Sequence, residues 1–313
     1  MGKNNSKSSI LNSRSLNKHF GTTEALKDIS FEVSKGEIFG LIGPDGAGKT
    51  TLFRILTSLI LADSGTATVN GLDVVKDYAE LRKHIGYMPG RFSLYQDLTV
   101  EENLNFYATI FNTTIQENYY LIKDIYKYIE PFKHRRAGKL SGGMKQKLAL
   151  SCALIHKPEV LFLDEPTTGV DPVSRKEFWE MLRRLKEDGI TIIVSTPYMD
   201  EANLCDRIAL MQSGRIFSIE TPANIVKQFP KKLYKVESDN NYALLEKLRG
   251  NPQIESVFMF GDNLHVTFKE ELTMDNGQWI VDNNCQLSIV NCQFKQIQPS
   301  VEDCFMAFNI NKE

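Results

Sequence analysis

A glycine-rich segment of this 313-residue chain has the residue types and spacing of a phosphate-binding loop. It reads Gly43-Pro44-Asp45-Gly46-Ala47-Gly48-Lys49-Thr50 and fits the pattern G-x-x-x-x-G-K-[ST]. Its glycines let backbone N–H groups converge on phosphate oxygens, and the N-terminus of the helix predicted over residues 49–60 adds a partial positive charge. The lysine would reach the β- and γ-phosphates, and the threonine hydroxyl would bind Mg²⁺.

Two acidic residues follow a second apolar run. Residues 160–163 predict a buried strand, and Asp164 and Glu165 come directly after it. A carboxylate at this strand end would lie beside Thr50 and hold Mg²⁺ through water. Glu165 would then polarise the attacking water as a general base.

A third segment, Ser141-Gly142-Gly143, precedes a predicted helix. Exposed N–H groups at a helix N-terminus attract an anion. A serine that caps a helix after a turn would have the same sequence, so the tripeptide by itself leaves both interpretations open.

The elements that must position these residues follow from the hydrophobic pattern. Strand runs at Ile38–Ile42, 160–163 and 191–194 alternate with helical spacing, which predicts an α/β domain over residues 14–229. We expect added antiparallel strands at 25–33 and 64–69, and a helical subdomain over about 98–155. Residues 1–13, rich in Ser, Asn and Lys, predict a disordered lead-in.

Residues 230–313 predict a small C-terminal α+β domain of βαββαβ order. Its helices are expected at 243–249 and 274–283. Its strands are expected at 233–236, 257–260, 264–268 and 287–289, and a hairpin joins the second and third of them.

Composition narrows the class of protein. Apolar residues make up 42% and charged residues 24% of the chain, which is ordinary globular usage and excludes a wholly disordered protein. The net charge of −2 disfavours sequence-independent binding to nucleic acid, which usually needs a basic excess. The five cysteines form no C-x-x-C pair, so free thiols are expected. The chain has no uncharged apolar run of the roughly 18–20 residues that a membrane helix needs.

The order of these segments resembles that of the ATP-binding subunits of ABC transporters. The resemblance covers about residues 16–229 and rests on the loop 43–50, on Leu140-Ser141-Gly142-Gly143-Met144-Lys145-Gln146, on residues 160–166, and on Thr168-Gly169-Val170-Asp171. It implies a P-loop NTPase fold of the ABC ATPase type, with an antiparallel β subdomain and a helical insertion. It also implies ATP and Mg²⁺ as ligands.

The resemblance assigns roles by matched position. Residues 43–51, Thr51 included, look like the Walker A loop, Asp164 like the Walker B acid and Glu165 like the catalytic base. Three further matches are the signature motif (Ser141, Gly142 and Gly143), the D-loop acid at the dimer interface (Asp171), and the aromatic residue that stacks on adenine (Phe20). The family works as a head-to-tail dimer, so the signature of this chain would serve its partner's ATP.

Two positions depart from the family pattern. Gly90 stands where the family has the glutamine of the Q-loop, and Pro197 stands where it has the histidine of the H-loop. Glycine has no side chain to approach Mg²⁺, and proline offers neither an imidazole nor a backbone donor. We therefore expect this chain's own site to bind Mg-ATP but to hydrolyse it slowly, unless neighbouring groups compensate.

The resemblance implies an ATPase subunit that drives a separate polytopic membrane permease, of the bacterial drug- or lipid-exporter type. It would lie in the cytoplasm, on the inner face of the membrane. The departures favour a heterodimer with a second ABC ATPase subunit over a homodimer, and nucleic acid is not expected as a partner. The alternatives are a soluble ABC ATPase that acts on nucleic acid or ribosomes, and a regulatory subunit that binds ATP without hydrolysis.

Overall fold

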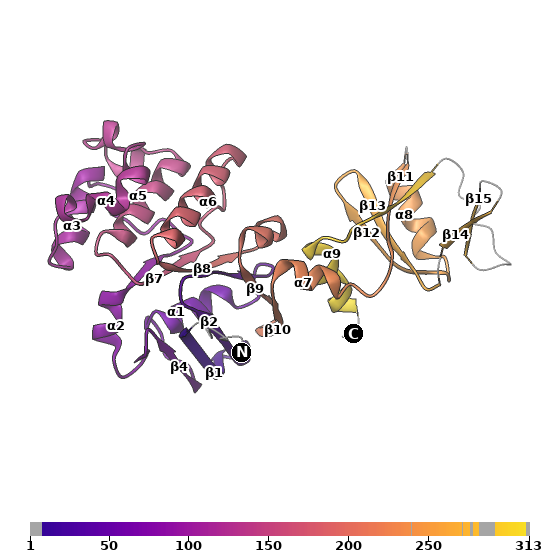
Figure 1. The fold of residues 1–313 in the computed structure, drawn as a ribbon, viewed down its shortest axis with the longest axis horizontal. Helices are drawn as coiled ribbons and strands as arrows, with labels where there is room; N and C mark the ends of the chain where they lie inside the picture. Colours follow the sequence, from indigo (N-terminus) through magenta and orange to yellow (C-terminus); the bar gives the residue numbers. More distant parts are fainter. Residues whose placement is uncertain (1–7, 239, 271, 276–277, 282–291, 311–313) are drawn as a thin grey trace, which may run out of the picture. The chain divides into compact units, whose positions relative to one another are not determined.

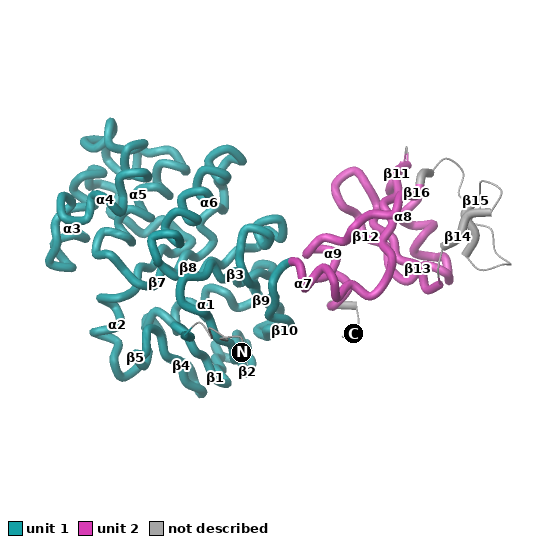
Figure 2. The backbone as a smooth tube through the Cα atoms, viewed as in Figure 1, with its two compact units in different colours: residues 1–222 teal, residues 223–313 magenta. Residues whose placement is uncertain are grey.

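The chain divides into two compact units in the computed structural model, residues 1–222 and 223–313 (Figure 2). The structure describes residues 8–238, 240–270, 272–275, 278–281 and 292–310. The boundary between the units lies at 222/223, whereas the sequence predicts it at 229/230.

The first unit contains a six-stranded sheet that carries the glycine-rich loop. The five strands β9, β3, β8, β7 and β6 run parallel, and β10 pairs antiparallel with β9 at one edge. Every residue of β3, β7 and β8 is buried, as expected for near-continuous apolar runs in a parallel sheet that is covered on both faces. The bounds are β3 (Ile38–Ile42), β6 (Ile85–Met88), β7 (Val160–Asp164), β8 (Thr191–Thr196), β9 (Arg207–Gln212) and β10 (Arg215–Glu220).

A four-stranded antiparallel sheet lies in the same unit, with strand order β2-β1-β4-β5. Its strands are β1 (Ser9–Phe20), β2 (Thr23–Ser34), β4 (Ser64–Val69) and β5 (Leu72–Asp73). The prediction of a disordered lead-in is wrong for residues 9–13, which belong to β1. Leu11 is fully buried and pairs with Val33 and Val69, so two apolar side chains secure this otherwise polar segment.

Helices α3 (Val100–Ile110), α4 (Ile115–Tyr126) and α5 (Gly142–Leu154) make up the region predicted as a helical subdomain. In Figure 1 they lie together, away from the β1–β4 sheet. Capping boxes fix the starts of α3 and α4: Thr99 and Thr114 each accept a hydrogen bond from the backbone N–H of a glutamate three residues later.

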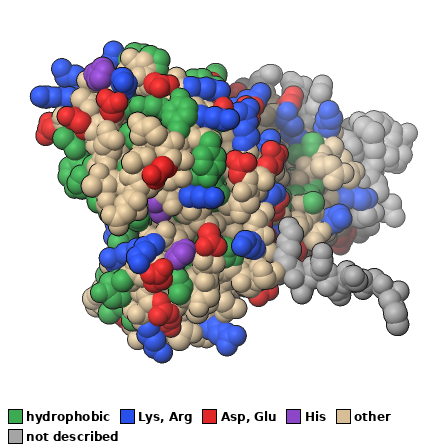
Figure 3. Space-filling view, turned by 60° about the vertical axis from the view of Figure 1, so that its left-hand side comes forward, with side chains coloured by type: hydrophobic (Ala, Val, Ile, Leu, Met, Phe, Trp, Pro, Cys, Tyr) green, Lys and Arg blue, Asp and Glu red, His purple; other side chains and the backbone are tan. Residues whose placement is uncertain are grey.

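On the face of the molecule in Figure 3, basic and acidic side chains are interspersed.

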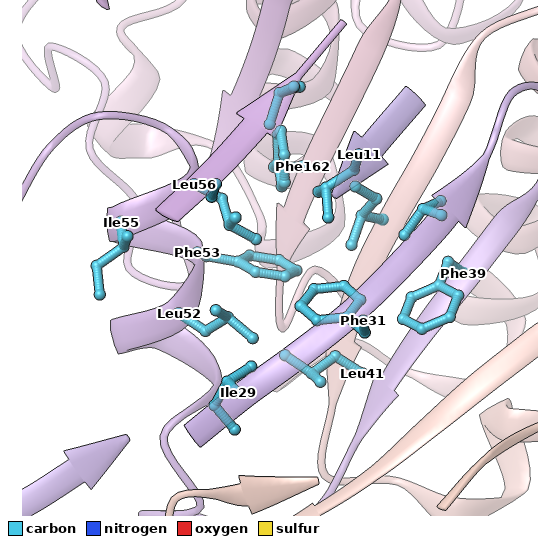
Figure 4. Close-up of a cluster of buried hydrophobic side chains, with 14 of the residues drawn as sticks. Leu11, Ile29, Phe31, Phe39, Leu41, Leu52, Phe53, Ile55, Leu56 and Phe162 are labelled. Carbon is cyan, nitrogen blue, oxygen red and sulfur yellow. The ribbon is translucent and has the colours of Figure 1, made fainter. Parts of the chain in front are cut away.

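Helices α1 (Lys49–Leu56), α2 (Tyr78–His84) and α6 (Pro172–Glu187) complete the first unit. Helix α1 is shorter than the predicted helix over 49–60, because Ser58 adopts a left-handed φ of 59°. Its buried face packs onto the sheets (Figure 4). Phe53 of α1 meets Phe162 of β7 edge to face at 5.6 Å, and this contact ties the helix after the loop to the strand that ends in Asp164.

The second unit holds a four-stranded antiparallel sheet of order β12-β13-β11-β16. Its elements are β11 (Leu233–Ser238), α8 (Asn241–Arg249), β12 (Ile254–Phe260), β13 (Asn263–Phe268), β16 (Cys292–Ile297) and α9 (Val301–Ile310), and α7 (Pro222–Lys227) begins at the junction. His265 Nδ1 lies 2.7 Å from Asp303 Oδ1, and the Ser300 hydroxyl donates to Asp303 Oδ2 at 2.6 Å. Burial opposes ionisation of Asp303, yet these hydrogen bonds outweigh it and lower its pKa.

The helix predicted over 274–283 is wrong for the residues that the structure describes. Strands β14 (Leu272–Asp275) and β15 (Gln278–Val281) pair antiparallel there instead. The stretch Trp279-Ile280-Val281 consists of aromatic and β-branched residues, which favour strands. The strand predicted at 287–289 lies outside the described residues. The strands over 272–275 and 278–281 replace the second helix of the predicted βαββαβ order.

Candidate nucleotide site

The glycine-rich loop joins β3 to α1 in a backbone conformation that only glycine adopts easily. Gly46 and Gly48 have φ of 78° and 104°, and Gly48 is the N-cap of α1. A Cβ on Gly48 would also lie 2.5 Å from the carbonyl oxygen of Ala25 in β2. The loop thus presents backbone N–H groups and a helix N-terminus on one side, while its other side is packed against β2.

Lys49 places a buried cation at this loop. Its Nζ donates to the carbonyl oxygens of Gly43 at 2.8 Å and Pro44 at 3.0 Å, and it lies 3.2 Å from Oε1 of Glu165. These three oxygens compensate the charge of an ammonium group whose side chain is 2% exposed. Phosphate oxygens could take over the same role for the lysine.

The two acids predicted to act on the nucleotide lie at the end of β7. Asp164 is 2% exposed, and its Oδ1 accepts hydrogen bonds from Thr50 Oγ1 at 3.2 Å and from Ser195 Oγ at 2.6 Å. Glu165 follows with a left-handed φ of 48°, unusual for a non-glycine residue. The structure therefore brings Lys49 and Thr50, at the start of α1, together with Asp164 and Glu165, at the end of β7.

A pocket of about 440 Å³ opens beside these groups. Residues 46–51 and Glu165 line it, together with the start of β2 and the turn at Ser213 and Gly214. Phe20, the last residue of β1, is 50% exposed, with Lys18 Nζ 5.5 Å from its ring centroid. Phe20 is not one of the residues that line this pocket.

The segment Ser141, Gly142 and Gly143 lies at a different place, the N-terminus of α5. Ser141 is the N-cap and accepts from the N–H of Met144 at 3.4 Å. A Cβ on Gly143 would lie 3.2 Å from Ser174 Oγ in α6. The predicted D-loop acid, Asp171, caps α6, and hydrogen bonds from the backbone N–H groups of Ser174 and Val173 lower its pKa. Residues 141–143 do not line the 440 Å³ pocket.

The donor set fits a Mg²⁺-nucleotide. A threonine hydroxyl and an aspartate carboxylate, 3.2 Å apart, are the hard oxygen ligands that Mg²⁺ takes in one or two positions while it keeps waters and phosphates in the rest. Thr50 and Asp164 would hold the ion, and Lys49 with the loop N–H groups would hold the phosphates.

Comparison with known proteins agrees with this chemistry. A family model described as ABC transporter matches residues 26–168. The linearmycin resistance ATP-binding protein LnrL of Bacillus subtilis is 38% identical over 220 residues, which are 69% of this chain and 70% of LnrL. The chain belongs to the family of ABC transporter ATP-binding proteins.

Other members show how far the likeness extends. The probable multidrug ABC transporter ATP-binding protein YbhF of Escherichia coli is 41% identical over 80% of this chain, which spans only 44% of the length of YbhF. The solved structure of CbiO1 from Clostridium perfringens, part of the ABC transporter complex CbiONQ, aligns with 70% of this chain and 91% of its own, at 29% identity and a TM-score of 0.63. These neighbours confirm the predicted P-loop NTPase fold of the ABC ATPase type.

In this family of ATP-binding proteins, ATP hydrolysis and association with a membrane permease are general. None of the helices in the described part of the chain combines the length and the hydropathy of a membrane-spanning segment.

Gly90 and Pro197, the two positions that the sequence analysis singles out as departures, lie next to residues of this site. A Cβ on Gly90 would lie 3.0 Å from the carbonyl oxygen of Asp164. Pro197 directly follows β8, whose last residue, Thr196, accepts a hydrogen bond from the N–H of Gly43 at 3.3 Å. Both positions thus adjoin the residues predicted to bind the nucleotide.

Two buried polar residues near the site are not predicted from the sequence: Ser195 in β8, and Glu201 in the segment after β8. Ser195 bonds to Asp164, as described above. Glu201 is 1% exposed and accepts from the hydroxyls of Thr196 at 2.6 Å and Thr167 at 2.7 Å, so it ties the segment after β8 to the segment after β7. A serine directly after the apolar run 191–194 is the sequence signal for the first, and no spacing pattern indicates the second.

Proposed function

We propose that this chain binds Mg-ATP at its glycine-rich loop, hydrolyses it slowly at its own site, and uses its signature segment to complete the site of a second, different ABC ATPase subunit. The observation that carries the proposal is the pair Gly90 and Pro197. Gly90, next to Asp164, lacks the glutamine side chain of the family pattern, and Pro197, near Gly43, lacks its histidine.

Binding and hydrolysis depend on different parts of this site. Lys49, Thr50 and Asp164 supply the cation, the hydroxyl and the carboxylate that hold a Mg²⁺-triphosphate, and Glu165 can serve as base. Hydrolysis also needs donors preorganised toward the charge that develops on the γ-phosphate, and loss of one such donor costs about 10²–10³ in rate. Residue 197 is a proline and cannot donate.

The need for a second subunit follows from the place of the signature segment. Residues 141–143 start α5 next to α6 and do not line the pocket formed by residues 46–51. In a head-to-tail dimer this helix N-terminus would face the ATP of the partner. Because the signature is intact while the chain's own site lacks two groups, a heterodimer with one competent site accounts for both features.

We further propose that a polytopic permease docks on an apolar pocket of about 210 Å³. The end of β6 with Met88 and Pro89, and helix α3 with Tyr107, line this pocket, which therefore adjoins Gly90. The chain would then sit peripherally on the inner face of the membrane. Relatives named for multidrug transport, linearmycin resistance and Nod factor export favour an exporter. The mixed charge on the face in Figure 3 gives no support for nucleic acid as a partner.

Steady-state ATP hydrolysis by the purified chain tests this proposal, with ATP binding measured in parallel. A Lys49→Ala variant sets the background, because it removes the cation that contacts the loop carbonyls and Glu165. ATP binding with turnover at the Lys49→Ala level supports a slow site that depends on a partner. Robust turnover that disappears in Lys49→Ala contradicts it and favours a homodimeric motor.

A further inference from the structure

A single buried serine in β8 contacts both acids of the nucleotide site. Ser195 is fully buried, and its Oγ donates to Oδ1 of Asp164 at 2.6 Å. The same Oγ accepts from the backbone N–H of Glu165 at 3.1 Å, and that N–H also donates to the carbonyl oxygen of Ser195 at 3.0 Å. One residue of the neighbouring strand therefore holds the side chain of one acid and the backbone of the other.

The contact to Glu165 fixes an unfavourable backbone conformation. A non-glycine residue at φ 48° is unfavourable and persists only where the surroundings determine its conformation. The two acceptors that Ser195 offers to the Glu165 N–H supply such a constraint. The backbone conformation of Glu165 determines the direction of its side chain. The contact with Ser195 therefore also positions the Glu165 carboxylate.

The contact to Asp164 orients a carboxylate that has one other hydrogen-bond donor in the described part of the chain. Within the described part of the chain, both hydrogen bonds to this carboxylate fall on Oδ1: the one from Ser195, and a longer one of 3.2 Å from Thr50. Thr50 is itself a predicted Mg²⁺ ligand. Ser195 is thus the partner that can hold the carboxylate when the threonine hydroxyl turns toward the ion, and this leaves Oδ2 to accept from metal-bound water.

We propose that Ser195 is a positioning residue for the magnesium ion that accompanies ATP in this chain. It acts through Asp164 and Glu165 and touches neither nucleotide nor metal. This inference rests on the proposed ATP site. Its specific consequence is that loss of the hydroxyl weakens binding of the divalent ion far more than metal-free ATP binding. Lys49 contacts Glu165, but it also donates to the carbonyl oxygens of Gly43 and Pro44, and these two contacts do not involve Ser195.

The test measures Mn²⁺ binding to the ATP-bound protein by electron paramagnetic resonance, and ATP binding in EDTA by fluorescence. Ser195→Ala is compared with the wild type, with Ser195→Thr, which keeps a hydroxyl, and with Ser151→Ala. Ser151 is a matched control: it is equally buried, and its hydroxyl donates to the Lys147 carbonyl in α5 at 2.8 Å. We expect a Mn²⁺ dissociation constant about 10–100-fold higher in Ser195→Ala, as for other residues that orient metal ligands, with recovery in Ser195→Thr.

Three results would overturn the inference: Mn²⁺ binding by Ser195→Ala equal to the wild type, an equal loss in Ser151→Ala, or a parallel loss of ATP binding in EDTA. If the added methyl group of Ser195→Thr prevents folding, the comparison of the two alanine variants decides the question. A wild-type protein that binds no ATP in either buffer refutes the proposed function, and the role of Ser195 falls with it. ATP binding by the wild type with no change in Ser195→Ala refutes the role of Ser195 alone.

Discussion

Replacement of Pro197 by histidine should raise the rate of ATP hydrolysis at the chain's own site. The residue before it, Thr196, is hydrogen-bonded to the glycine-rich loop: its carbonyl oxygen accepts from the N–H of Gly43 at 3.3 Å. An imidazole here would add a donor next to the bound phosphates. A single preorganised donor contributes about 2.7–4 kcal/mol, or 10²–10³ in rate. Because Gly90 still has no side chain, we expect the lower end, about 10²-fold.

The assay is steady-state phosphate release by the wild type, Pro197→His and Pro197→Ala at saturating Mg-ATP. The alanine variant is the matched control, since it restores the backbone N–H of residue 197 without an imidazole. We expect Pro197→His to exceed Pro197→Ala and ATP affinity to change little. Equal turnover of the two variants would refute the reasoning, because a backbone change would then explain any gain.

Three further predictions concern the site and the second unit. Gly90→Gln should raise turnover less than Pro197→His and should lower the thermal unfolding midpoint, because its Cβ would lie 3.0 Å from the Asp164 carbonyl oxygen. Gly90→Ala should lower the midpoint by the same amount. An unchanged midpoint in both variants would contradict this contact. In urea unfolding, Gly48→Ala should lose more stability than Gly46→Ala, because both have positive φ but only the former meets a backbone carbonyl; we expect about 1–2 kcal/mol for Gly46→Ala. Asp303→Asn should cost about 1.5–3 kcal/mol near neutral pH. Burial raises the pKa of Asp303, whereas hydrogen bonds with His265 and Ser300 lower it, and the net result is a decrease from 3.8. The contribution of Asp303 to stability is therefore present above about pH 4 and is lost as the pH falls below that value. A stability difference between Asp303→Asn and the wild type that stays constant down to about pH 3 in thermal unfolding would contradict this.

The sequence predicts the fold well where local pattern and tertiary context agree. Ile38–Ile42 is apolar at all but one position and is flanked by glycines, so its place as a buried central strand follows from composition alone. The sequence pattern does not predict the start of β1, because four of its first six residues are polar, and only pairing with β2 and β4 makes Leu11 a core residue. The pattern predicts a helix where β14 and β15 form, because helical spacing and strand propensity compete in so short a stretch.

The candidate site divides in the same way. The loop and the acids can be predicted because their chemistry imposes a fixed spacing along the chain. The roles of Ser195 and Glu201 cannot, since each acts across strands or loops that are distant in sequence: the hydroxyl of Ser195 meets an acid 31 residues before it. The backbone strain at Glu165 likewise results from packing and has no signature in residue type.

The most direct test of the account is the identity of the nucleotide that the chain retains. The purified wild type is incubated with Mg-ATP for many turnover times of an active ABC ATPase, freed from unbound nucleotide, and its bound nucleotide is identified by chromatography. The account predicts that ATP remains bound and intact. Bound ADP would show that the site hydrolyses without the groups missing at Gly90 and Pro197, and would contradict the account.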